Sequence, residues 1–449
     1  MPLFKAYDIR GVVPDELDAA IAYRIGRGVG HYIHGEYGGE TLAVGRDART
    51  HTPELADALT RGIRDEGVTV VDLGLVATPM LYHAVDHLGL AGGVMVTASH
   101  NPGQYNGFKV CRENAIPIGG DSGLADIERL ASERAEAPVA EPRGDLKNAD
   151  VLETYLAQSL AVGGACPPMK IAIDCGNGMA AVGLEPLLER LPLEVERLYF
   201  EPDGTFPNHE ANPLVEENLR DLVAAVRRTG ARLGVAFDGD ADRAMFIDEN
   251  GELVRADVVT ALLAQVRLRE NPGGTVLYDL RSSLATAEAI REAGGEAGIC
   301  RVGHSFIKAD MRARDAIFAG ELSGHFYFRF SPTLVADDGI AAFVALLDCM
   351  AESGKPLSEL AAPLLRYSAS GEINREVPDP AALIEAIASE HAEASEISRL
   401  DGLLVRYPDW WFNLRPSNTE PVLRLNLEAA DPKAMASRRD ALLARIEAG

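Results

Sequence analysis

The sequence predicts an α/β protein with three related domains and a fourth domain of a different kind. A chain of 449 residues is too long for one hydrophobic core, because single cores stop growing at about 250–300 residues. A pattern of strand, helix, strand, helix and strand occurs three times, and the C-terminal part departs from it. Such alternation is typical of a parallel sheet with helices on both faces.

The first strand of each repeat is apolar and ends in an aspartate and a turn. These strands lie in TLAVGRDAR (41–49), KIAIDCGNG (170–178) and TVLYDLRSS (275–283). A helix, a second strand, a further helix and a third strand follow each of them. We expect the first helices over 53–66, 180–191 and 284–293, the second strands over 68–75, 193–201 and 296–304, and the third strands over 94–102, 233–243 and 316–325.

The C-terminal part reads as strands and hairpins with two helices, over 380–389 and 433–448. This pattern predicts a separate α+β domain. Polar stretches that contain Pro or Gly mark the boundaries between domains. The predicted domains are 1–148, 149–252, 253–367 and 368–449.

The amino-acid composition argues against several classes of function. The net charge of −25 argues against a nucleic-acid or anionic membrane partner. No apolar run is long enough to span a bilayer, and the first residues lack a secretion signal. Five scattered cysteines without C-x-x-C spacing suit reduced thiols. We therefore expect a cytoplasmic protein, either a monomer or a homodimer.

The third strands all end in polar loops, and ligands of open α/β sheets bind at such strand ends. In DGDADR (238–243), Asp238, Asp240 and Asp242 alternate, and three carboxylates this close favour a divalent cation with oxygen ligands. An EF-hand is disfavoured because Arg243 stands where that loop needs Gly. A solvated acidic turn remains the alternative.

The loop TASHNP (97–102) carries Ser99 at the end of a buried strand. It lacks the G-x-S-x-G pattern of hydrolases. We expect His100 to be a poor base for Ser99, because neighbouring side chains on an extended backbone diverge. A phosphorylated serine against a metal ion suits phosphoryl transfer, which depends on charge neutralisation. Taken alone, the serine fits a helix cap better.

Two further loops offer groups that bind phosphate or sugar. RPSNTEP (415–421) presents a guanidinium, which grips phosphate with two hydrogen bonds, together with hydroxyls and an amide. GELSGH (320–325) presents polar side chains that can form hydrogen bonds with sugar hydroxyls. An ordinary turn and a strand end are the respective alternatives. The candidate residues are Arg415, Ser417, Asn418 and Thr419 in the first loop, and Glu321, Ser323 and His325 in the second.

In their order along the chain, TASHNP, DGDADR, GELSGH and RPSNTEP resemble the signature loops of the α-D-phosphohexomutase superfamily. The N-terminal FKAYDIRG (4–11) resembles that family as well. The resemblance implies four domains around a central cleft, namely three related α/β domains and a C-terminal domain with a small antiparallel sheet.

The resemblance also implies a reaction. Ser99 is expected to carry a phosphoryl group, and Mg²⁺ is expected on the phosphoserine and the three aspartates of DGDADR. The phosphoryl group would move between O1 and O6 of a hexose through a 1,6-bisphosphate of glucose or mannose. The RPSNTEP residues would hold the second phosphate, and Glu321 and Ser323 would read the O3 and O4 hydroxyls.

Matching positions suggest roles for further residues. Arg10 and Lys109 align with basic residues that aid proton transfer or stabilise charge near the phosphoserine. One departure is Arg281, where close relatives carry Lys, and Arg keeps the charge but not the reach of Lys. The remaining residues expected at the cleft are His100, Arg243 and His304.

The sugar loop bears on the substrate. Leu322 in GELSGH resembles the apolar residue of members that act on mannose and glucose phosphates, whereas members that act on glucosamine phosphate usually carry Gln. Contacts to O3 and O4 ignore O2, where mannose and glucose differ. We therefore predict activity on both sugars, with a phosphoglucosamine mutase as the alternative. A magnesium-dependent sugar-phosphate phosphatase is a further alternative.

Overall fold

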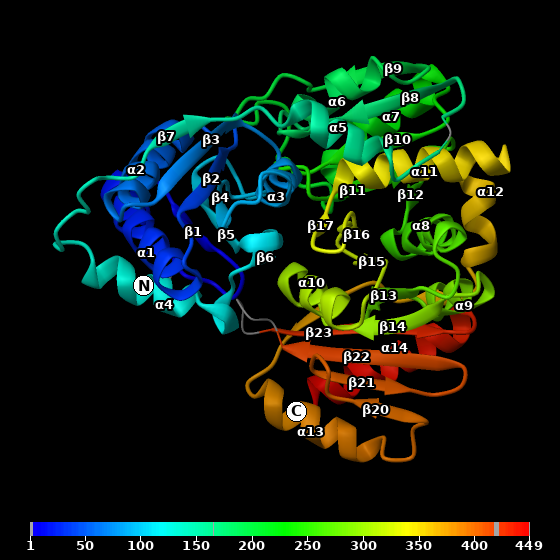
Figure 1. The fold of residues 1–449 in the computed structure, drawn as a ribbon. Helices are drawn as coiled ribbons and strands as arrows, with labels where there is room; N and C mark the ends of the chain where they lie inside the picture. The colour runs from blue at the N-terminus through cyan, green and yellow to red at the C-terminus, as the bar shows by residue number, and fades with distance from the viewer. Residues whose placement is uncertain (1–2, 165, 417–421, 449) are drawn as a thin grey trace.

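The computed structural model describes residues 3–164, 166–416 and 422–448. Within these ranges the strands form four β-sheets that follow one another along the chain (Figure 1). Each of the first three contains parallel pairs joined through helices, and the fourth is antiparallel. The predicted fold class, three α/β domains followed by an α+β domain with an antiparallel sheet, is confirmed.

The first sheet is mixed, so the predicted parallel arrangement holds for only part of it. Its elements are β1 (Ile9–Val12), α1 (Ala19–Tyr37), β2 (Thr41–Arg46), α2 (Thr52–Asp65), β3 (Thr69–Leu75), α3 (Thr78–His87), β4 (Gly92–Val96), β5 (Tyr105–Arg112), β6 (Ile116–Pro117), α4 (Leu124–Glu133) and β7 (Leu146–Asn148). The strand order is β1-β5-β4-β2-β3-β7, with β6 on β5. β2 is parallel to β3 and β4, but β5 returns antiparallel to β4. The loop with Ser99 therefore joins two strands, which excludes a helix-capping role for this serine.

The second sheet has the order β12-β11-β10-β8-β9. Its segment contains α5 (Leu152–Leu160), β8 (Met169–Asp174), α6 (Ala180–Leu188), β9 (Leu193–Leu198), α7 (Arg220–Thr229), β10 (Gly234–Phe237), β11 (Ala244–Ile247) and β12 (Leu253–Val254). β8 is parallel to β9 and β10, whereas β11 folds back antiparallel onto β10. The acidic loop is the connection between β10 and β11, and every residue of both strands is buried.

The third sheet repeats this plan in the order β14-β13-β15-β16-β17. Its segment contains α8 (Ala256–Glu270), β13 (Thr275–Asp279), α9 (Leu284–Glu292), β14 (Glu296–Cys300), α10 (His304–Ala313), β15 (Phe318–Gly320), β16 (Phe326–Arg329), β17 (Val335–Asp337), α11 (Gly339–Ser353) and α12 (Leu357–Ala361). GELSGH forms the turn between β15 and the antiparallel β16. In all three sheets, the polar loop therefore lies where the parallel strands give way to an antiparallel one.

The fourth sheet is antiparallel throughout, in the order β18-β23-β22-β21-β20 with β19 on β23. Its segment contains β18 (Ser368–Ala369), β19 (Ile373–Glu376), α13 (Pro380–Glu390), β20 (Glu396–Ser398), β21 (Leu403–Arg406), β22 (Trp410–Pro416), β23 (Val422–Ala429) and α14 (Pro432–Glu447). Figure 1 shows this orange and red segment below β14 and α10 of the third.

The hydrophobic cores divide the chain unevenly. One cluster of buried residues runs through the first three segments, from Ala43 to Leu364. The last segment has its own cluster, from Val377 to Ile446. Polar contacts join the last segment to the third, including Glu428, which accepts a hydrogen bond from the backbone of Leu284 at 2.9 Å. No helix of the described ranges is both long enough and apolar enough to cross a membrane.

Candidate active site

Ser99 lies in the turn between β4 and β5, where it is buried against the second segment. Its hydroxyl donates a hydrogen bond of 2.8 Å to Oδ2 of Asp238, which follows β10. The backbone of Ser99 has a φ of 52°, in the left-handed region that non-glycine residues seldom adopt. The first and second segments therefore bring the serine and the acidic loop into direct contact.

The three aspartates of DGDADR are buried together, so the reading as a solvated turn is wrong. Their relative exposures are 0%, 0% and 2% for Asp238, Asp240 and Asp242. One carboxylate oxygen from each lies within 4.8 Å of those from the other two. The flanking elements are strands, which also excludes an EF-hand.

Two basic side chains face these carboxylates. Lys109, on β5, places Nζ 2.6 Å from Asp240 and 2.5 Å from Asp242. Arg243 places NH2 2.9 Å from Asp238. Three carboxylates thus meet two cations, which favours the binding of further positive charge.

The electrostatics of the loop fit a metal ion. Burial raises the pKa of Asp238 to about 7. Burial also acts to raise the pKa of Asp242, but Lys109 and His325 outweigh it and hold that pKa well below its usual value. Oδ1 of Asp240 is buried and accepts no hydrogen bond from the residues that the structure describes. A buried, unpaired oxygen beside two other carboxylates is suited to a hard divalent cation.

His100 lies close to Ser99, and the expectation that the two side chains diverge is wrong. Nδ1 of His100 is 3.2 Å from the Ser99 hydroxyl. The expectation assumed an extended backbone, whereas Ser99 adopts a left-handed conformation. Burial, followed by Arg243 and Arg10, holds the pKa of His100 well below its usual value, so the ring is neutral near pH 7. Arg10 reaches the same loop, because NH1 donates to Asn101 Oδ1 at 2.5 Å.

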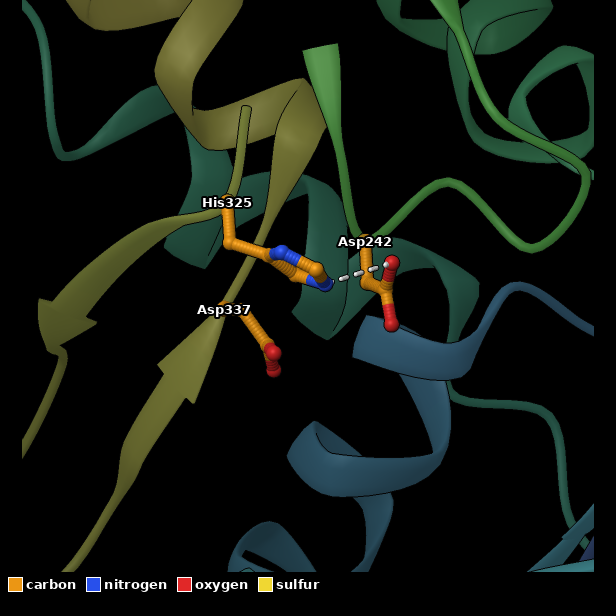
Figure 2. Close-up of side chains that lie close together, drawn as sticks. All are labelled: Asp242, His325 and Asp337. Atoms are coloured by element: carbon orange, nitrogen blue, oxygen red, sulfur yellow. Dashed lines mark ion pairs between the residues drawn. The ribbon is translucent and has the colours of Figure 1, made fainter. Parts of the chain in front are cut away.

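The turn after β15 contacts the acidic loop. Figure 2 shows His325 directed toward Asp242, with Nε2 3.4 Å from Oδ1, and Asp337 beside them. Nδ1 of the same ring is 2.9 Å from the Ser323 hydroxyl and 3.4 Å from Glu321. Burial lowers the pKa of His325, but Asp242 more than offsets this and raises it. The residues predicted to read the sugar are thus linked to those predicted to bind metal.

His304 is the first residue of α10. Its ring stacks with that of His325, and the two ring centroids are 6.4 Å apart. Burial, followed by Lys308 and Lys109, holds the pKa of His304 well below its usual value. His304 therefore lies beside His325 of the sugar loop.

Arg281 and Arg415 form a second cluster with Glu372. Arg281 donates to both oxygens of Asp279 at 3.0 Å and lies 3.4 Å from Glu321. Glu372 lies 3.8 Å from Arg281 and 3.5 Å from Arg415, across the junction of the third and fourth segments. The predicted phosphate-binding residues Ser417, Asn418 and Thr419 lie outside the described residues.

A cavity of about 470 Å³ opens where the second, third and fourth segments meet. Arg255, Arg281 and Leu322 of the sugar loop are among the residues that line it. Trp411 and Asn426 close it from the fourth sheet. The cavity therefore adjoins the cluster of Arg281, Arg415 and Glu372, and its two arginines are paired with Asp257 and Asp279.

Three polar residues at this site were not predicted from the sequence. Thr78, at the start of α3, donates to Asp240 at 2.6 Å. Glu372 pairs with the two arginines described above. Arg49 donates to the carbonyl oxygen of Ser99 at 2.8 Å. The one available signal was the position of Arg49 three residues after the strand β2, in GRDAR (45–49).

Three α/β segments and an antiparallel fourth, with a serine loop set against an acidic loop, define the class of α-D-phosphohexomutases predicted from the sequence. Comparison with known families agrees over nearly the whole chain. Residues 1–137, 155–251 and 255–367 match phosphoglucomutase/phosphomannomutase alpha/beta/alpha domains I, II and III, and residues 372–445 match the C-terminal domain. The chain belongs to the phosphoglucomutase/phosphomannomutase family.

Individual relatives share its full length. A phosphomannomutase of Salmonella montevideo is 40% identical over 436 residues, which cover 95% of this chain and 94% of the relative. A phosphoglucomutase of Neisseria meningitidis serogroup A is 39% identical, covering 99% and 96%. The crystal structure of a phosphoglucomutase/phosphomannomutase family protein from Burkholderia thailandensis has a TM-score of 0.91 at 35% identity, covering 99% and 97%.

Proposed function

We propose that this protein is a phosphomannomutase/phosphoglucomutase, which moves a phosphoryl group between O1 and O6 of mannose or glucose phosphate. The observation that carries the proposal is the 2.8 Å hydrogen bond from Ser99 to Asp238 within a buried acidic cluster. A serine in this place can accept a phosphoryl group beside a cation. Family membership and full-length relatives of both names support the same activity.

Asp238, Asp240, Asp242 and the phosphorylated Ser99 would hold Mg²⁺. The fit rests on three buried carboxylates and on the unpaired Oδ1 of Asp240. When bound, the ion supplies charge neutralisation for the phosphoryl oxygens. Lys109 and Arg243 keep the carboxylates in place and add positive charge on either side of them.

In the proposed transfer, the phosphoryl group passes from Ser99 to a sugar hydroxyl. A sugar hydroxyl attacks phosphorus and loses its proton, the bond from phosphorus to Ser99 Oγ breaks, and Oγ gains a proton. His100 is placed to exchange this proton, since Nδ1 lies 3.2 Å from Oγ and the ring is neutral. The hexose 1,6-bisphosphate then turns around, and its other phosphate returns to Ser99. Arg10, held against the same loop, stabilises charge on the phosphoryl group.

The remaining side chains bind the rest of the sugar phosphate. Arg415 binds the phosphate that does not react, together with Ser417, Asn418 and Thr419 of its own loop. Arg281 binds the same phosphate. Glu321 accepts hydrogen bonds from the sugar hydroxyls, and Ser323 donates a hydrogen bond to them. His325 and His304 complete this side, since the His325 ring connects Ser323 to Asp242. We also propose the domain limits given above, at 148, 252 and 367.

Both mannose and glucose phosphates are the proposed substrates, and the matching 1,6-bisphosphate is the activator. The test is a ³¹P NMR time course of glucose 1-phosphate with the protein, Mg²⁺ and a trace of glucose 1,6-bisphosphate. We expect conversion to glucose 6-phosphate without free phosphate. Accumulation of inorganic phosphate would instead establish the phosphatase, in which water accepts the phosphoryl group.

A further inference from the structure

The backbone of Ser99 is held in a conformation that it does not favour by itself. A φ of 52° at a serine costs about 1–3 kcal/mol and persists only where the surroundings impose it. Thr97 contributes one restraint, because its hydroxyl accepts a hydrogen bond of 2.9 Å from the backbone of Ser99. Backbone hydrogen bonds within the turn restrain two carbonyl oxygens, since Ala98 accepts from Asn101 at 3.1 Å and Pro102 accepts from Tyr105 at 3.0 Å.

Arg49 adds further restraints from the inside of the loop. Its side chain is 1% exposed. NH2 donates to the carbonyl oxygens of Ser99 at 2.8 Å and Asn101 at 2.6 Å. NH1 donates to the carbonyl oxygens of Pro102 at 2.8 Å and Tyr105 at 3.0 Å. One guanidinium thus fixes four carbonyl groups around the turn that carries the serine.

Arg49 is itself locked in place. Nε donates to Oδ2 of Asp47 at 3.1 Å, so all five guanidinium donors are used. Oδ1 of Asp47 accepts the Thr52 hydroxyl at 2.7 Å and the backbone of Arg49 at 3.0 Å. The ring of Phe206, from the second segment, covers the guanidinium at 5.0 Å. These contacts leave the head group a single orientation.

The second segment closes the loop from the opposite side. A Cβ atom on Gly239, in the acidic loop, would lie 2.4 Å from the Ser99 carbonyl oxygen. A Cβ atom on Gly204 would lie 2.1 Å from Cα of Arg49. The two glycines therefore allow the backbones to approach closely. A shift of the Ser99 carbonyl would alter its fit against the metal-binding loop.

We propose that Arg49 is a positioning residue for phosphoryl transfer, which holds the Ser99 loop so that the hydroxyl meets Asp238. The inference rests on the proposed function, because it assigns Arg49 to that reaction. Lysine cannot replace it, since an ammonium has three donors and no planar fork. Arg49 touches no reacting atom and holds only the loop that carries the serine. We therefore expect its substitution to lower kcat and to leave sugar binding unchanged.

Arg49→Lys tests this inference, with Arg27→Lys as the matched control. Arg27 is also 1% exposed and lies in the same domain. It donates to the carbonyl oxygens of Ala137 and Pro138 and pairs with Glu66, away from Ser99. Both substitutions remove a buried guanidinium that binds backbone carbonyls. A purely structural role would therefore affect both variants alike.

We expect both variants to lose thermal stability, and only Arg49→Lys to lose activity of the folded protein. Its kcat should fall about a hundredfold, with KM for glucose 1-phosphate unchanged, while Arg27→Lys keeps the kcat of the wild type. An unchanged kcat in Arg49→Lys, or an equal loss in Arg27→Lys, would overturn the inference. Wild-type protein that converts no hexose phosphate would instead contradict the proposed function, and the inference would fall with it.

A milder variant covers the case in which Arg49→Lys does not fold. Thr52→Val keeps the shape of the side chain and removes the hydrogen bond that orients Asp47, the partner of Arg49. The Thr52 hydroxyl also accepts a hydrogen bond of 2.7 Å from Asn106, so the variant loses two hydrogen bonds, at about 1 kcal/mol each. We expect kcat to fall about threefold or more with KM unchanged. A kcat equal to that of the wild type would overturn the inference.

Discussion

The hydroxyl of Ser99 lies 2.8 Å from Asp238, although 139 residues separate them in the sequence. The contact joins a turn of the first sheet to a turn of the second, and both turns follow buried strands. Because one carboxylate of the acidic loop touches the serine, a cation on that loop would also touch a phosphoryl group on Ser99.

Ser99→Ala is expected to abolish turnover. Alanine cannot carry the phosphoryl group, and loss of a nucleophile lowers kcat by about a thousandfold or more. Steady-state kinetics with glucose 1-phosphate and calorimetric titration with the same ligand measure turnover and binding separately. Binding should persist, and Ser132→Ala, on the exposed face of α4, should keep full activity. Near-normal turnover of Ser99→Ala would refute the serine as phosphoryl carrier.

Lys109→Met is expected to make stability more dependent on Mg²⁺. Removing one partner of a buried ion pair costs about 3–5 kcal/mol, and Lys109 pairs with both Asp240 and Asp242. Without the ammonium, these carboxylates attract a divalent ion more strongly, and ion binding restores part of the loss. Urea unfolding with and without Mg²⁺ measures the difference.

Arg27→Met is the control for this prediction, because Arg27 is also buried in an ion pair but lies away from the acidic loop. Mg²⁺ should stabilise Arg27→Met no more than it stabilises the wild type. If Mg²⁺ raised the free energy of unfolding equally in wild type and Lys109→Met, the acidic loop would not be the metal site.

Arg415→Ala is expected to weaken substrate binding with a smaller effect on kcat. A hydrogen bond to a charged group contributes about 1.5–3 kcal/mol, so KM for glucose 1-phosphate should rise about tenfold or more. Initial rates over a range of substrate concentration provide the measurement. Arg406→Ala removes a guanidinium from the adjacent strand, where it pairs with Glu396, and should leave KM unchanged. An unaltered KM in Arg415→Ala would remove Arg415 from the phosphate site.

Mannose 1-phosphate and glucose 1-phosphate are expected to react at comparable rates. Glu321 and Ser323 lie together on the turn after β15, and their proposed contacts to O3 and O4 are the same for both sugars. Coupled assays of kcat/KM on each sugar, with glucosamine 1-phosphate alongside, test this. A glucosamine rate far above both would assign the protein as a phosphoglucosamine mutase.

The order of elements was predictable because it depends on local pattern. Apolar strands that end in polar loops predicted where Asp238, Glu321 and Ser99 would lie, at one end of each sheet. The antiparallel strands after these loops were missed. β11 and β16 are short and wholly or largely buried, and a short apolar run does not reveal its direction.

Contacts between distant segments could not be predicted in the same way. Lys109 and Asp242 are 133 residues apart, and no spacing rule connects a lysine on one sheet to a carboxylate on the next. The direction of the His100 side chain was predicted for an extended backbone. The left-handed turn at Ser99 instead brings the His100 ring to the Ser99 hydroxyl. Arg49 was missed because four of its five hydrogen bonds go to backbone carbonyls, which leave no trace in the sequence.

Ser99 is proposed to carry the phosphoryl group that moves between the sugar oxygens, and one experiment follows that group directly. Wild-type protein, phosphorylated with glucose 1,6-bisphosphate and freed of sugar, can be mixed with one equivalent of glucose 1-phosphate. Intact-mass and peptide mass spectrometry then follow phosphate on Ser99, and ³¹P NMR follows the sugar. We expect Ser99 to lose its phosphate as glucose 1,6-bisphosphate appears. Turnover with no phosphate on Ser99 at any stage would refute Ser99 as the phosphoryl carrier.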